Sequence, residues 1–190
     1  GFVGTSNLEA GLLYGIPTVG TSAHSFTLLH DSEEDAFAAQ VASLGPSTTI
    51  LVDTYDIATG VERAVKAARA AGGELGAVRL DSGDLVAEAF KVRAQLDALG
   101  ATSTKITVTN DLDEHAIAAL GAAPVDSYGV GTKLVTGSGR PTAALVYKLV
   151  EREGADGTME EVADEARAAL TPKLTALDPD PCELDETAEE

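Results

Sequence analysis

Apolar runs recur along the chain at a nearly constant distance, and this spacing limits the folds that it can adopt. The run at 48–53 begins 28 residues before the run at 76–80, which begins 29 residues before the run at 105–108. Ala-rich stretches with the apolar period of a helix separate these runs. One βαβ unit takes about 30 residues. The spacing therefore predicts successive strand–helix units and a parallel sheet.

The same pattern predicts five strands and five helices. The strands are expected at 16–21, 48–53, 76–80, 105–108 and 127–130. The helices are expected at 8–14, 32–44, 57–71, 84–99 and 113–120. Residues that commonly begin or end helices stand at these boundaries: Asn7, Ser32 and Asn110 or Asp111 at the starts, and Gly72, Gly73 and Gly100 at the ends. The core is expected to be aliphatic, because apolar residues make up 44% of the chain and aromatic residues only 4%.

Polar residues gather directly after each predicted strand, within 21–25, 53–56, 79–84, 110–113 and 129–132. In a β/α barrel the loops that follow the strands share one face, and that face carries the active site. We therefore predict an α/β fold, with parallel strands and intervening helices, in which these polar residues converge. A complete barrel needs about 250 residues, and five strands would leave unpaired edges, so we expect an incomplete barrel.

A change in composition near residue 150 predicts two regions. Residues 1–150 would form a partial α/β barrel that carries the catalytic residues, and residues 151–190 an acidic tail that is helical or disordered. The last 41 residues contain 14 acidic and 3 basic side chains. The local pattern predicts a turn-containing stretch at 133–139, a strand at 143–150, a helix at 160–170 and disorder from Thr171 onward.

Charge and cysteine content narrow the functional class. A net charge of −18 argues against nucleic acids and anionic membranes as partners. The single cysteine, Cys182, excludes an internal disulfide and a cysteine-based zinc cluster. We find no apolar run of about eighteen residues and no signal peptide, so we expect a cytoplasmic protein. The first residue is Gly1 and an organised motif follows at once, as in a piece of a longer chain.

His24 and Asp53 are the first candidates for a chemical role. His24 lies at a strand end between small residues, so a ligand can approach its ring. A neutral imidazole can attack a phosphoryl group, bind a metal or shuttle a proton, and the alternative is a hydrogen-bonded structural histidine. Asp53 and Asp56 follow the next strand three residues apart and can hold Mg²⁺ or sugar hydroxyls. For Asp56 we favour a helix cap.

Arg79 and Asp81 form a second candidate pair. Alternation along a strand places both side chains on one side, toward the mouth of the barrel. Arg79 can bind a carboxylate or a phosphate through its forked guanidinium group. Asp81 can bind ribose hydroxyls or a metal, or stabilise positive charge at an anomeric carbon. The alternative is an ion pair between the two side chains, and Asp84 is expected to cap the following helix.

Two further polar segments are less specific. Asn110 and Asp111 follow a strand and precede a helix, which suits a ligand role and a capping role equally. Gly131 and Thr132 lie in a glycine-containing turn whose backbone N–H groups and hydroxyl can meet a phosphate. His30 and His115 are assigned surface or structural roles, and Cys182 is assigned no function.

An ordered set of short motifs resembles the nicotinate phosphoribosyltransferase family. In the family's order, the motifs are GTSN at 4–7, YGIP at 14–17, GTSAHS at 20–25, DTYD at 53–56, RLDSGD at 79–84, GVGT at 129–132 and VYKL at 146–149. Each motif alone is weak, but an ordered set of this many is specific. The resemblance covers roughly residues 1–153.

The resemblance implies a type II phosphoribosyltransferase fold, which is an irregular α/β barrel with an added N-terminal domain. It implies a homodimer whose active site lies near the subunit interface. The implied reaction joins nicotinate to the phosphoribosyl group of phosphoribosyl pyrophosphate and gives nicotinate mononucleotide and pyrophosphate, in the salvage route of NAD biosynthesis. ATP is hydrolysed to ADP and phosphate alongside, and Mg²⁺ is the implied metal cofactor.

The resemblance also implies a role for each candidate residue. His24 matches the histidine that ATP phosphorylates, while Asp53 and Asp81 match the acidic positions around ribose and Mg²⁺. We therefore expect these three residues to be catalytic, and no residue is assigned as a direct metal ligand. The substrate-binding positions are matched by Thr21 and Arg79 for nicotinate, and by Gly131 and Thr132 for the phosphoribosyl phosphate.

Two departures from the family pattern affect what the chain is expected to do. The N-terminal domain, which supplies an aromatic residue that stacks on the pyridine ring, is missing. The sequence after Glu153 is acidic where a basic, Gly-containing segment is expected. We therefore expect the 190 residues alone to be inactive. Three alternatives stay open: a nicotinamide phosphoribosyltransferase, a non-catalytic truncated barrel that binds a phosphorylated ligand, and a generic β/α-barrel enzyme acting on a phosphosugar.

Overall fold

The computed structural model describes residues 1–137, 142, 145 and 147–162. The chain divides into two units, Gly1–Tyr147 and Lys148–Glu190, and each is described by itself. The assignment of the first region as a catalytic domain and of the second as an acidic tail stays a prediction. Two predictions lie outside the described residues: the part of the 160–170 helix that follows residue 162, and the disorder expected from Thr171 onward.

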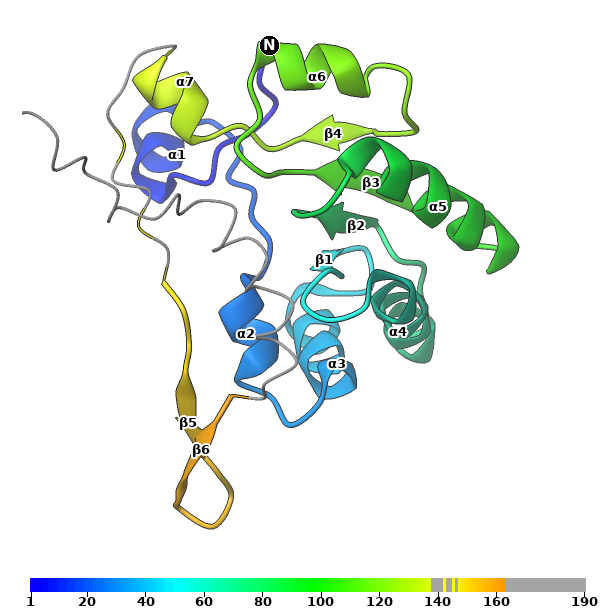
Figure 1. The fold of residues 1–190 in the computed structure, drawn as a ribbon, viewed down its shortest axis with the longest axis vertical. Coiled ribbons are helices and arrows are strands. Elements are labelled where there is room, and N and C mark those ends of the chain that lie inside the picture. The colour runs from blue at the N-terminus through cyan, green and yellow to red at the C-terminus, as the bar shows by residue number, and fades with distance from the viewer. Residues whose placement is uncertain (138–141, 143–144, 146, 163–190) are drawn as a thin grey trace, which may run out of the picture. The chain divides into compact units, whose positions relative to one another are not determined.

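A parallel four-stranded sheet forms the centre of the first unit (Figure 1). Its strands stand in chain order: β1 (Thr49–Leu51), β2 (Ala77–Leu80), β3 (Lys105–Val108) and β4 (Ser127–Tyr128). Arg79 pairs with Leu51 on one side and with Thr107 on the other. This register brings the C-terminal ends of the strands to one edge of the sheet. The predicted α/β arrangement is confirmed, with four of the five expected strands present.

Helices follow the strands as the spacing predicts. The described residues contain α1 (Leu8–Tyr14), α2 (His24–Leu28), α3 (Glu33–Leu44), α4 (Ile57–Ala70), α5 (Leu85–Ala98), α6 (Glu114–Leu120) and α7 (Thr132–Thr136). The five predicted helices are confirmed to within one residue at each end, whereas α2 and α7 were not predicted. None of these described helices is long and apolar enough to cross a membrane.

Side-chain caps fix where the long helices begin. The side chains of Asn7, Ser32, Asp56 and Asp84 each accept a hydrogen bond from the backbone N–H three residues later. Such a bond satisfies one of the N–H groups that the first helical turn leaves without a partner. The prediction that Asp56 and Asp84 cap helices is therefore confirmed, and both helices start directly after a polar strand end.

Residues 16–21 do not form the predicted strand. Within this stretch, all of which the structure describes, the only β pairing is a single parallel bridge between Thr18 and Thr5. Two backbone hydrogen bonds make the bridge, from the Thr5 N–H to the Pro17 carbonyl (3.0 Å) and from the Val19 N–H to the Thr5 carbonyl (2.9 Å). Pro17 has no N–H of its own to extend the pairing. The chain then enters α2 directly at His24.

The predicted cap of α6 is also wrong. Asp113, and not Asn110 or Asp111, accepts hydrogen bonds from the N–H groups of His115 and Ala116. Asn110 and Asp111 instead have φ angles of 100° and 47°, in the region that side chains with a Cβ rarely adopt. Two successive residues in that conformation turn the chain sharply between β3 and the helix.

Three predictions toward the end of the described chain need correction. The turn-containing stretch expected at 133–139 begins as helix α7. The residues of 143–150 that the structure describes carry no strand. Instead β5 (Glu151–Glu153) pairs antiparallel with β6 (Met159–Glu161), where the helix at 160–170 was expected to start. Gly157, with φ of 80°, lets the chain reverse between these strands.

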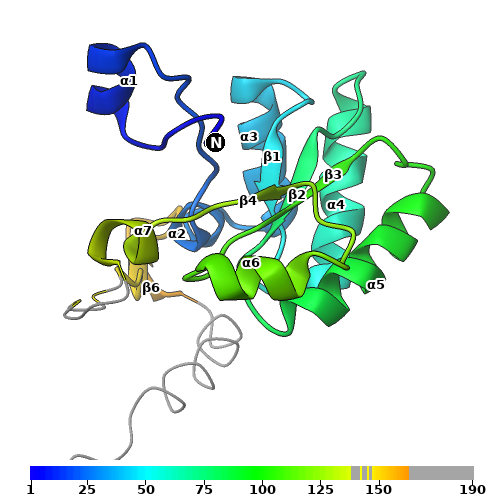
Figure 2. The same ribbon diagram turned by 90° about the horizontal axis from the view of Figure 1, so that it is seen from above.

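An aliphatic core lies between the sheet and three of its helices. Each helix from α3 to α5 packs against the next, and α5 also contacts β2 and β3. Figures 1 and 2 show α2 on the opposite side of the strands from α4 and α5. The buried side chains of the strands and of these helices include Phe37, Ile50, Val61, Val78, Leu96 and Ile106. The expectation of an aliphatic core is confirmed, with Phe37 as its one fully buried aromatic side chain among the described residues.

Gly76→Ala is expected to destabilise the fold by about 3 kcal/mol, a typical upper value for overpacking. A Cβ at Gly76 would overlap the carbonyl oxygen of Ser47, which precedes the neighbouring strand β1. Gly20→Ala is the control, because no atom lies within 4 Å of the Cβ that it would add and Gly20 does not have a positive φ. Urea unfolding of both variants measures the difference. Equal midpoints for the two variants would contradict the close approach.

Candidate active site

The ends of three strands and the segment before α2 bring a group of polar side chains together. Asp53 and Thr54 follow β1, Asp81 follows β2, and Thr109 follows β3, while Arg79 lies within β2. Parallel pairing in register places the residues that follow β1, β2 and β3 side by side. Thr21 and Ser22, which precede α2, and His24 at its start complete the group, which we call the His24 cluster. The predicted convergence of polar strand ends is therefore observed for three strands.

His24, the first residue of α2, lies between a hydroxyl group and two carboxylates. Its Nδ1 is 3.1 Å from the Thr54 hydroxyl oxygen. Its Nε2 is 3.8 Å from Oδ1 of Asp53 and 3.9 Å from Oδ2 of Asp81. The side chain is 24% exposed, so a ligand can reach it. One ring nitrogen is thus held by the protein while the other faces two acidic groups.

Asp53 organises the loop that follows β2. Its Oδ2 accepts a hydrogen bond from the Asp81 N–H (2.9 Å) and another from the Ser82 hydroxyl. Its Oδ1 is buried and has no hydrogen-bond partner among the described residues. Burying a carboxylate oxygen without a partner is costly, and a cation or a hydrogen-bond donor from a ligand would relieve that cost.

Asp56, the other acid of the same segment, has a different environment. Its Oδ1 accepts hydrogen bonds from the Thr59 hydroxyl (2.7 Å) and the Thr59 N–H (2.8 Å) at the start of α4. These bonds, from the hydroxyl first and the N–H second, lower the pKa of Asp56 below its ordinary value. Both donors belong to the helix, so Asp56 serves the fold.

Asp81 and Arg79 form the ion pair that the sequence left open as an alternative. Nη2 of Arg79 is 3.4 Å from Oδ2 of Asp81, and the two side chains are 21% and 26% exposed. The Thr109 hydroxyl donates to Oδ1 of Asp81 and accepts from Nε of Arg79 (2.9 Å). The pair remains reachable from solvent, so the ion pair and a role in ligand binding are compatible.

The guanidinium group of Arg79 also ties the sheet to the segment before α2. Its Nη1 donates to the Thr21 hydroxyl (2.6 Å) and to the Ser22 carbonyl (3.3 Å). Thr21 and Arg79, which were both predicted to contact nicotinate, are therefore in direct contact with each other. Most of the five N–H groups of Arg79 serve the protein, and Nη2 is the nitrogen that faces the acidic side of the site.

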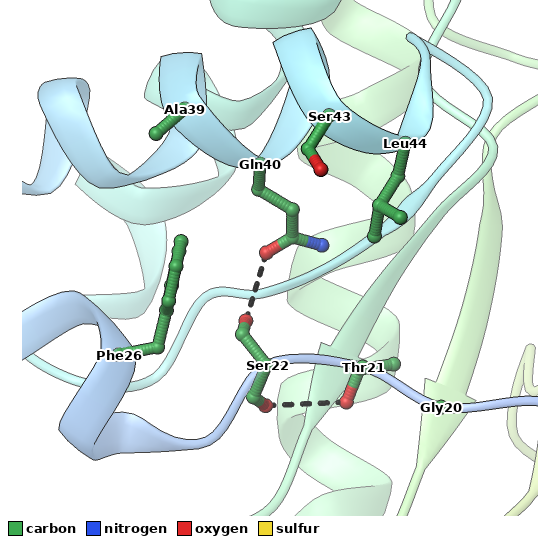
Figure 3. A pocket seen from close by; sticks show the side chains of 8 residues that line it. All are labelled: Gly20, Thr21, Ser22, Phe26, Ala39, Gln40, Ser43 and Leu44. Carbon is green, nitrogen blue, oxygen red and sulfur yellow. Dashed lines mark hydrogen bonds between the residues drawn. The ribbon is translucent and has the colours of Figure 1, made fainter.

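Gln40 supports this segment from behind. Its side chain is buried on α3, accepts from the Ser22 hydroxyl (2.8 Å), and donates to the carbonyl of Thr49 (2.8 Å) and the hydroxyl of Thr48 (3.2 Å). Figure 3 shows the bond from Ser22 to Gln40 at the centre of a pocket. The pocket has a volume of about 340 Å³ and is lined by Gly20, Thr21, Ser22, Phe26, Ala39, Gln40, Ser43 and Leu44. It shares Thr21 and Ser22 with the His24 cluster but contains none of the charged side chains.

Gln40→Met is expected to cost about 1–3 kcal/mol of stability, because the partly buried Ser22 hydroxyl and Thr49 carbonyl lose the bonds that the buried Gln40 amide makes with them. Gln95→Met is the matched control. Gln95 donates one exposed bond to the Ala58 carbonyl (2.7 Å), and surface substitutions cost about 0.5 kcal/mol or less. Urea unfolding measures both variants. A cost for Gln40→Met no larger than that for Gln95→Met would show that Gln40 does not anchor the segment.

The structure does not join Gly131 and Thr132 to the His24 cluster. Both are exposed at the start of α7, and the interactions observed among the described residues do not extend from them to His24. The loop after β4 does run beside the loop after β3, because Gly129 approaches the side chain of Thr109 closely. Their assignment to a phosphate loop stays a prediction.

The other two histidines have the structural or surface character that was predicted. Nδ1 of His30 lies 2.8 Å from the Phe26 carbonyl, which can only accept, so Nδ1 carries the proton. The ring of His30 also packs against Phe26, with centroids 4.7 Å apart. The side chain of His115 is 89% exposed. Cys182 lies outside the described residues.

Five residues in or beside the cluster were not singled out from the sequence: Ser22, Gln40, Thr54, Ser82 and Thr109. Ser22, Thr54 and Ser82 stand in the polar segments that were predicted and Thr109 directly precedes one, so their location was expected but their partners were not. Gln40 lies on a helix outside those segments, and no sequence signal distinguishes it. In the part of the chain that the structure describes, no three His, Cys, Asp or Glu residues form a metal-binding group.

Comparison with known proteins gives nicotinate phosphoribosyltransferases among the sequence relatives, although no family model matches the chain. A nicotinate phosphoribosyltransferase of Mycobacterium tuberculosis is 59% identical over 162 residues, which are 81% of this chain and 36% of the relative. The enzyme of the same name from Bacillus subtilis is 42% identical over 84% of this chain and 33% of its own length. The human one is 31% identical over 79% of this chain and 39% of its own length. The chain thus spans about a third of these relatives.

Solved structures agree with these relatives. Human nicotinic acid phosphoribosyltransferase matches with a TM-score of 0.58 and 27% identity, over 68% of this chain and 38% of that one. A nicotinate-nucleotide pyrophosphorylase from Pyrococcus furiosus matches with a TM-score of 0.59 and 27% identity, over 67% of this chain and 34% of that one. A nicotinate phosphoribosyltransferase from Porphyromonas gingivalis covers 90% of this chain and 51% of its own, with a TM-score of 0.68; at 20% identity it supports the fold alone.

Proposed function

We infer that this chain carries catalytic residues of a nicotinate phosphoribosyltransferase. By sequence it belongs to that family, and it spans about a third of the length of its relatives. The complete protein would convert nicotinate and phosphoribosyl pyrophosphate to nicotinate mononucleotide and pyrophosphate, with ATP hydrolysed alongside. The observation that carries the proposal is the cluster in which His24 faces Asp53 and Asp81 while Arg79 holds Asp81 and Thr21.

The fold supports a partial barrel of the type II phosphoribosyltransferase kind. Four parallel strands in chain order, with helices between them, are the repeating unit of such a barrel. The remaining strands and the domain that completes the pyridine site would come from the rest of the protein. A homodimer with the active site near the subunit interface, and a cytoplasmic location, belong to the same proposal.

Transfer of the phosphoribosyl group needs an anionic acceptor to be held and a developing cation to be stabilised. In the proposed reaction the nicotinate ring nitrogen attacks the anomeric carbon, the bond from that carbon to pyrophosphate breaks, and pyrophosphate takes the electron pair. Nη2 of Arg79 and the Thr21 hydroxyl would hold the nicotinate carboxylate. Asp81 would stabilise positive charge on the ribose, and Gly131 with Thr132 would bind its 5′-phosphate.

The residues present fit Mg²⁺, the metal that the family implies. Mg²⁺ binds proteins through one or two carboxylates and completes its coordination with water and substrate phosphates. Oδ1 of Asp53, which has no hydrogen-bond partner among the described residues, and the partly exposed Oδ2 of Asp81 both lie within 4 Å of Nε2 of His24. These two carboxylates would hold the ion, which would supply positive charge to the pyrophosphate group as it leaves.

His24 would couple ATP to the transfer. Phosphorylation would add negative charge between Asp53 and Asp81, and would change how tightly the anionic substrates bind. Hydrolysis of the phosphohistidine would then release the products and return the site to its first state. The chain supports this role by fixing one nitrogen of the ring on Thr54 and by leaving the side chain accessible.

The decisive assay uses the full-length protein with nicotinate, phosphoribosyl pyrophosphate and Mg²⁺, with and without ATP. Mass spectrometry of the products is expected to show nicotinate mononucleotide, formed faster when ATP is present. A parallel reaction with nicotinamide tests the nearest alternative, because the cation of Arg79 favours a carboxylate over a neutral amide. Preference for nicotinamide would replace the proposal, and absence of any mononucleotide would leave a non-catalytic barrel that binds a phosphorylated ligand.

A further inference from the structure

We propose that Thr109 is a positioning residue that keeps the ion pair of Arg79 and Asp81 open, so that Arg79 can bind the carboxylate of a substrate. This inference rests on the proposed function, because it concerns how that site selects an anionic acceptor. Thr109 would act only through Arg79 and Asp81. Gly129, in the loop after β4, would hold Thr109 in the orientation that this role needs.

The hydroxyl of Thr109 stands between the two charged side chains, directly after β3. Nε of Arg79 donates a hydrogen bond to the hydroxyl oxygen (2.9 Å). Arginine can only donate, so the single hydrogen of the hydroxyl remains available for the carboxylate. The hydroxyl donates it to Oδ1 of Asp81. One threonine therefore occupies a nitrogen of Arg79 and an oxygen of Asp81 at the same time.

This arrangement keeps the ion pair from closing. Arginine and a carboxylate commonly pair through two parallel N–H···O bonds. Here the hydroxyl occupies Nε and Oδ1, which would make one of those bonds. The other contact, from Nη2 of Arg79 to Oδ2 of Asp81, is 3.4 Å, longer than the about 2.7–2.9 Å of a charge-assisted hydrogen bond. Nη2 therefore lies near the carboxylate but is not tightly bound to it.

Gly129 fixes the orientation of the Thr109 side chain. It directly follows β4, and its N–H donates to the Val108 carbonyl (2.8 Å). A Cβ added at Gly129 would lie 2.5 Å from the methyl carbon of Thr109 and 3.6 Å from the Thr109 Cβ. The methyl group thus fills the space that a side chain at residue 129 would need. Turning the methyl group away would also turn the hydroxyl, because both are bonded to the same carbon.

An open pair favours an anionic acceptor over a neutral one. Nicotinate presents a carboxylate, to which Nη2 of Arg79 can donate a charge-assisted hydrogen bond. Nicotinamide presents a neutral amide in the same place and gains less from the cation. Closing the pair would direct both Nε and Nη2 to Asp81 and leave less positive charge for a ligand. Thr109 would therefore contribute to the choice of nicotinate over nicotinamide.

Three substitutions in the full-length protein test the role of the hydroxyl. Thr109→Ala removes the hydroxyl and leaves room for the pair to close, whereas Thr109→Ser keeps the hydroxyl and removes only the methyl group. Thr107→Ala is the matched control, because it makes the same change two residues earlier on the same face of β3, where the hydroxyl pairs with that of Ser127 (2.7 Å). The KM for nicotinate and the inhibition constant of nicotinamide are measured for each protein.

Thr109→Ala should raise the KM for nicotinate about tenfold, the lower end of what a hydrogen bond to a charged group contributes. It should change the inhibition constant of nicotinamide much less. Thr109→Ser and Thr107→Ala should both behave like the unchanged protein. A merely structural role would lower the melting temperature and weaken the binding of both ligands to the same extent, which would overturn the assignment.

Gly129→Ala tests the same idea from the neighbouring loop. Its Cβ should push the methyl group of Thr109 aside and turn the hydroxyl out of the pair, so the KM for nicotinate should rise as in Thr109→Ala. Adding Thr109→Ser should reverse this effect, because the nearest remaining atom is then the Cβ of residue 109 at 3.6 Å, an ordinary contact. A defect that Thr109→Ser does not reverse would overturn the assignment. This comparison decides even if Thr109→Ala does not fold.

The outcomes separate this inference from the function on which it rests. If the unchanged protein forms no nicotinate mononucleotide or prefers nicotinamide, the proposed function fails. If it is active and Thr109→Ala leaves the KM for nicotinate unchanged, the role of Thr109 is overturned and the function stands. A crystal structure of Thr109→Ala tests the spacing without any assay of activity. The distance from Nη2 to Oδ2 should shorten to about 2.9 Å, and a distance still near 3.4 Å would overturn the inference.

Discussion

His24→Ala in the full-length protein is expected to abolish its labelling by ATP, a loss of at least about 100-fold that reaches the background of the assay. No other side chain among the described residues combines a ring nitrogen near two carboxylates with access from solvent. Removing the nucleophile removes the covalent intermediate, so ATP should no longer stimulate formation of the nucleotide. The slow transfer that does not need ATP should persist, because Arg79 and Asp81 remain in contact with each other.

Labelling with γ-³²P-ATP, together with nucleotide formation measured with and without ATP, checks this result. His115→Ala is the matched control, since its side chain is 89% exposed and lies outside the cluster. It should retain both labelling and stimulation. Undiminished labelling of His24→Ala would place the phosphate elsewhere and remove His24 from the mechanism. Loss of both the ATP-dependent and the ATP-independent rates would mean that His24 serves the transfer itself.

The sequence predicted the strand–helix order because local signals determine it. Asp56 and Asp84 cap their helices through bonds to residues three positions away, and such bonds depend on neighbours in the chain. The spacing of the apolar runs likewise predicts β1, β2 and β3, since each run must be buried between helices. The same signals correctly placed Asp53, Arg79 and Asp81 near the C-terminal ends of neighbouring strands.

The partners inside the site depend on contacts between distant residues, and the sequence alone did not specify them. Thr109 bridges Arg79 and Asp81 from the end of β3, a strand that begins 28 residues after the start of β2. Gln40 reaches Ser22 from a helix that carries no polar motif. A threonine or glutamine has many possible roles, so only the register of the sheet and the packing of α3 reveal these two.

Local strain explains another part of what the sequence missed. Asn110 and Asp111 have residue types that often cap helices, and for that reason they were considered as caps of α6. Their positive φ angles, 100° and 47°, instead turn the chain before Asp113 takes the capping position. Strained backbone of this kind gathers near functional loops, and this loop directly follows Thr109 of the cluster.

Asp53→Asn is expected to lower kcat/KM for phosphoribosyl transfer by at least about 100-fold, the loss typical of removing one preorganised electrostatic group. The carboxylate uses Oδ2 to accept from the Asp81 N–H and the Ser82 hydroxyl, while Oδ1 faces Nε2 of His24. An amide puts an NH₂ group in one of these two places. It then either opposes the donors of Asp81 and Ser82 or presents N–H groups where Mg²⁺ would bind.

Asp56→Asn separates this effect from the loss of a charge on the same loop. Asparagine caps helices about as well as aspartate, so that variant should keep its activity and lose only a few tenths of a kcal/mol of stability, about the difference between good caps. Steady-state rates across a series of Mg²⁺ concentrations measure both variants. Asp53→Asn should need more Mg²⁺ for half-maximal rate, since one of the two proposed carboxylate ligands is gone. If the rate falls but the Mg²⁺ requirement is unchanged, Asp53 does not bind Mg²⁺. It would then act only by positioning His24 and, through the bonds of its Oδ2 to Asp81 and Ser82, the loop after β2.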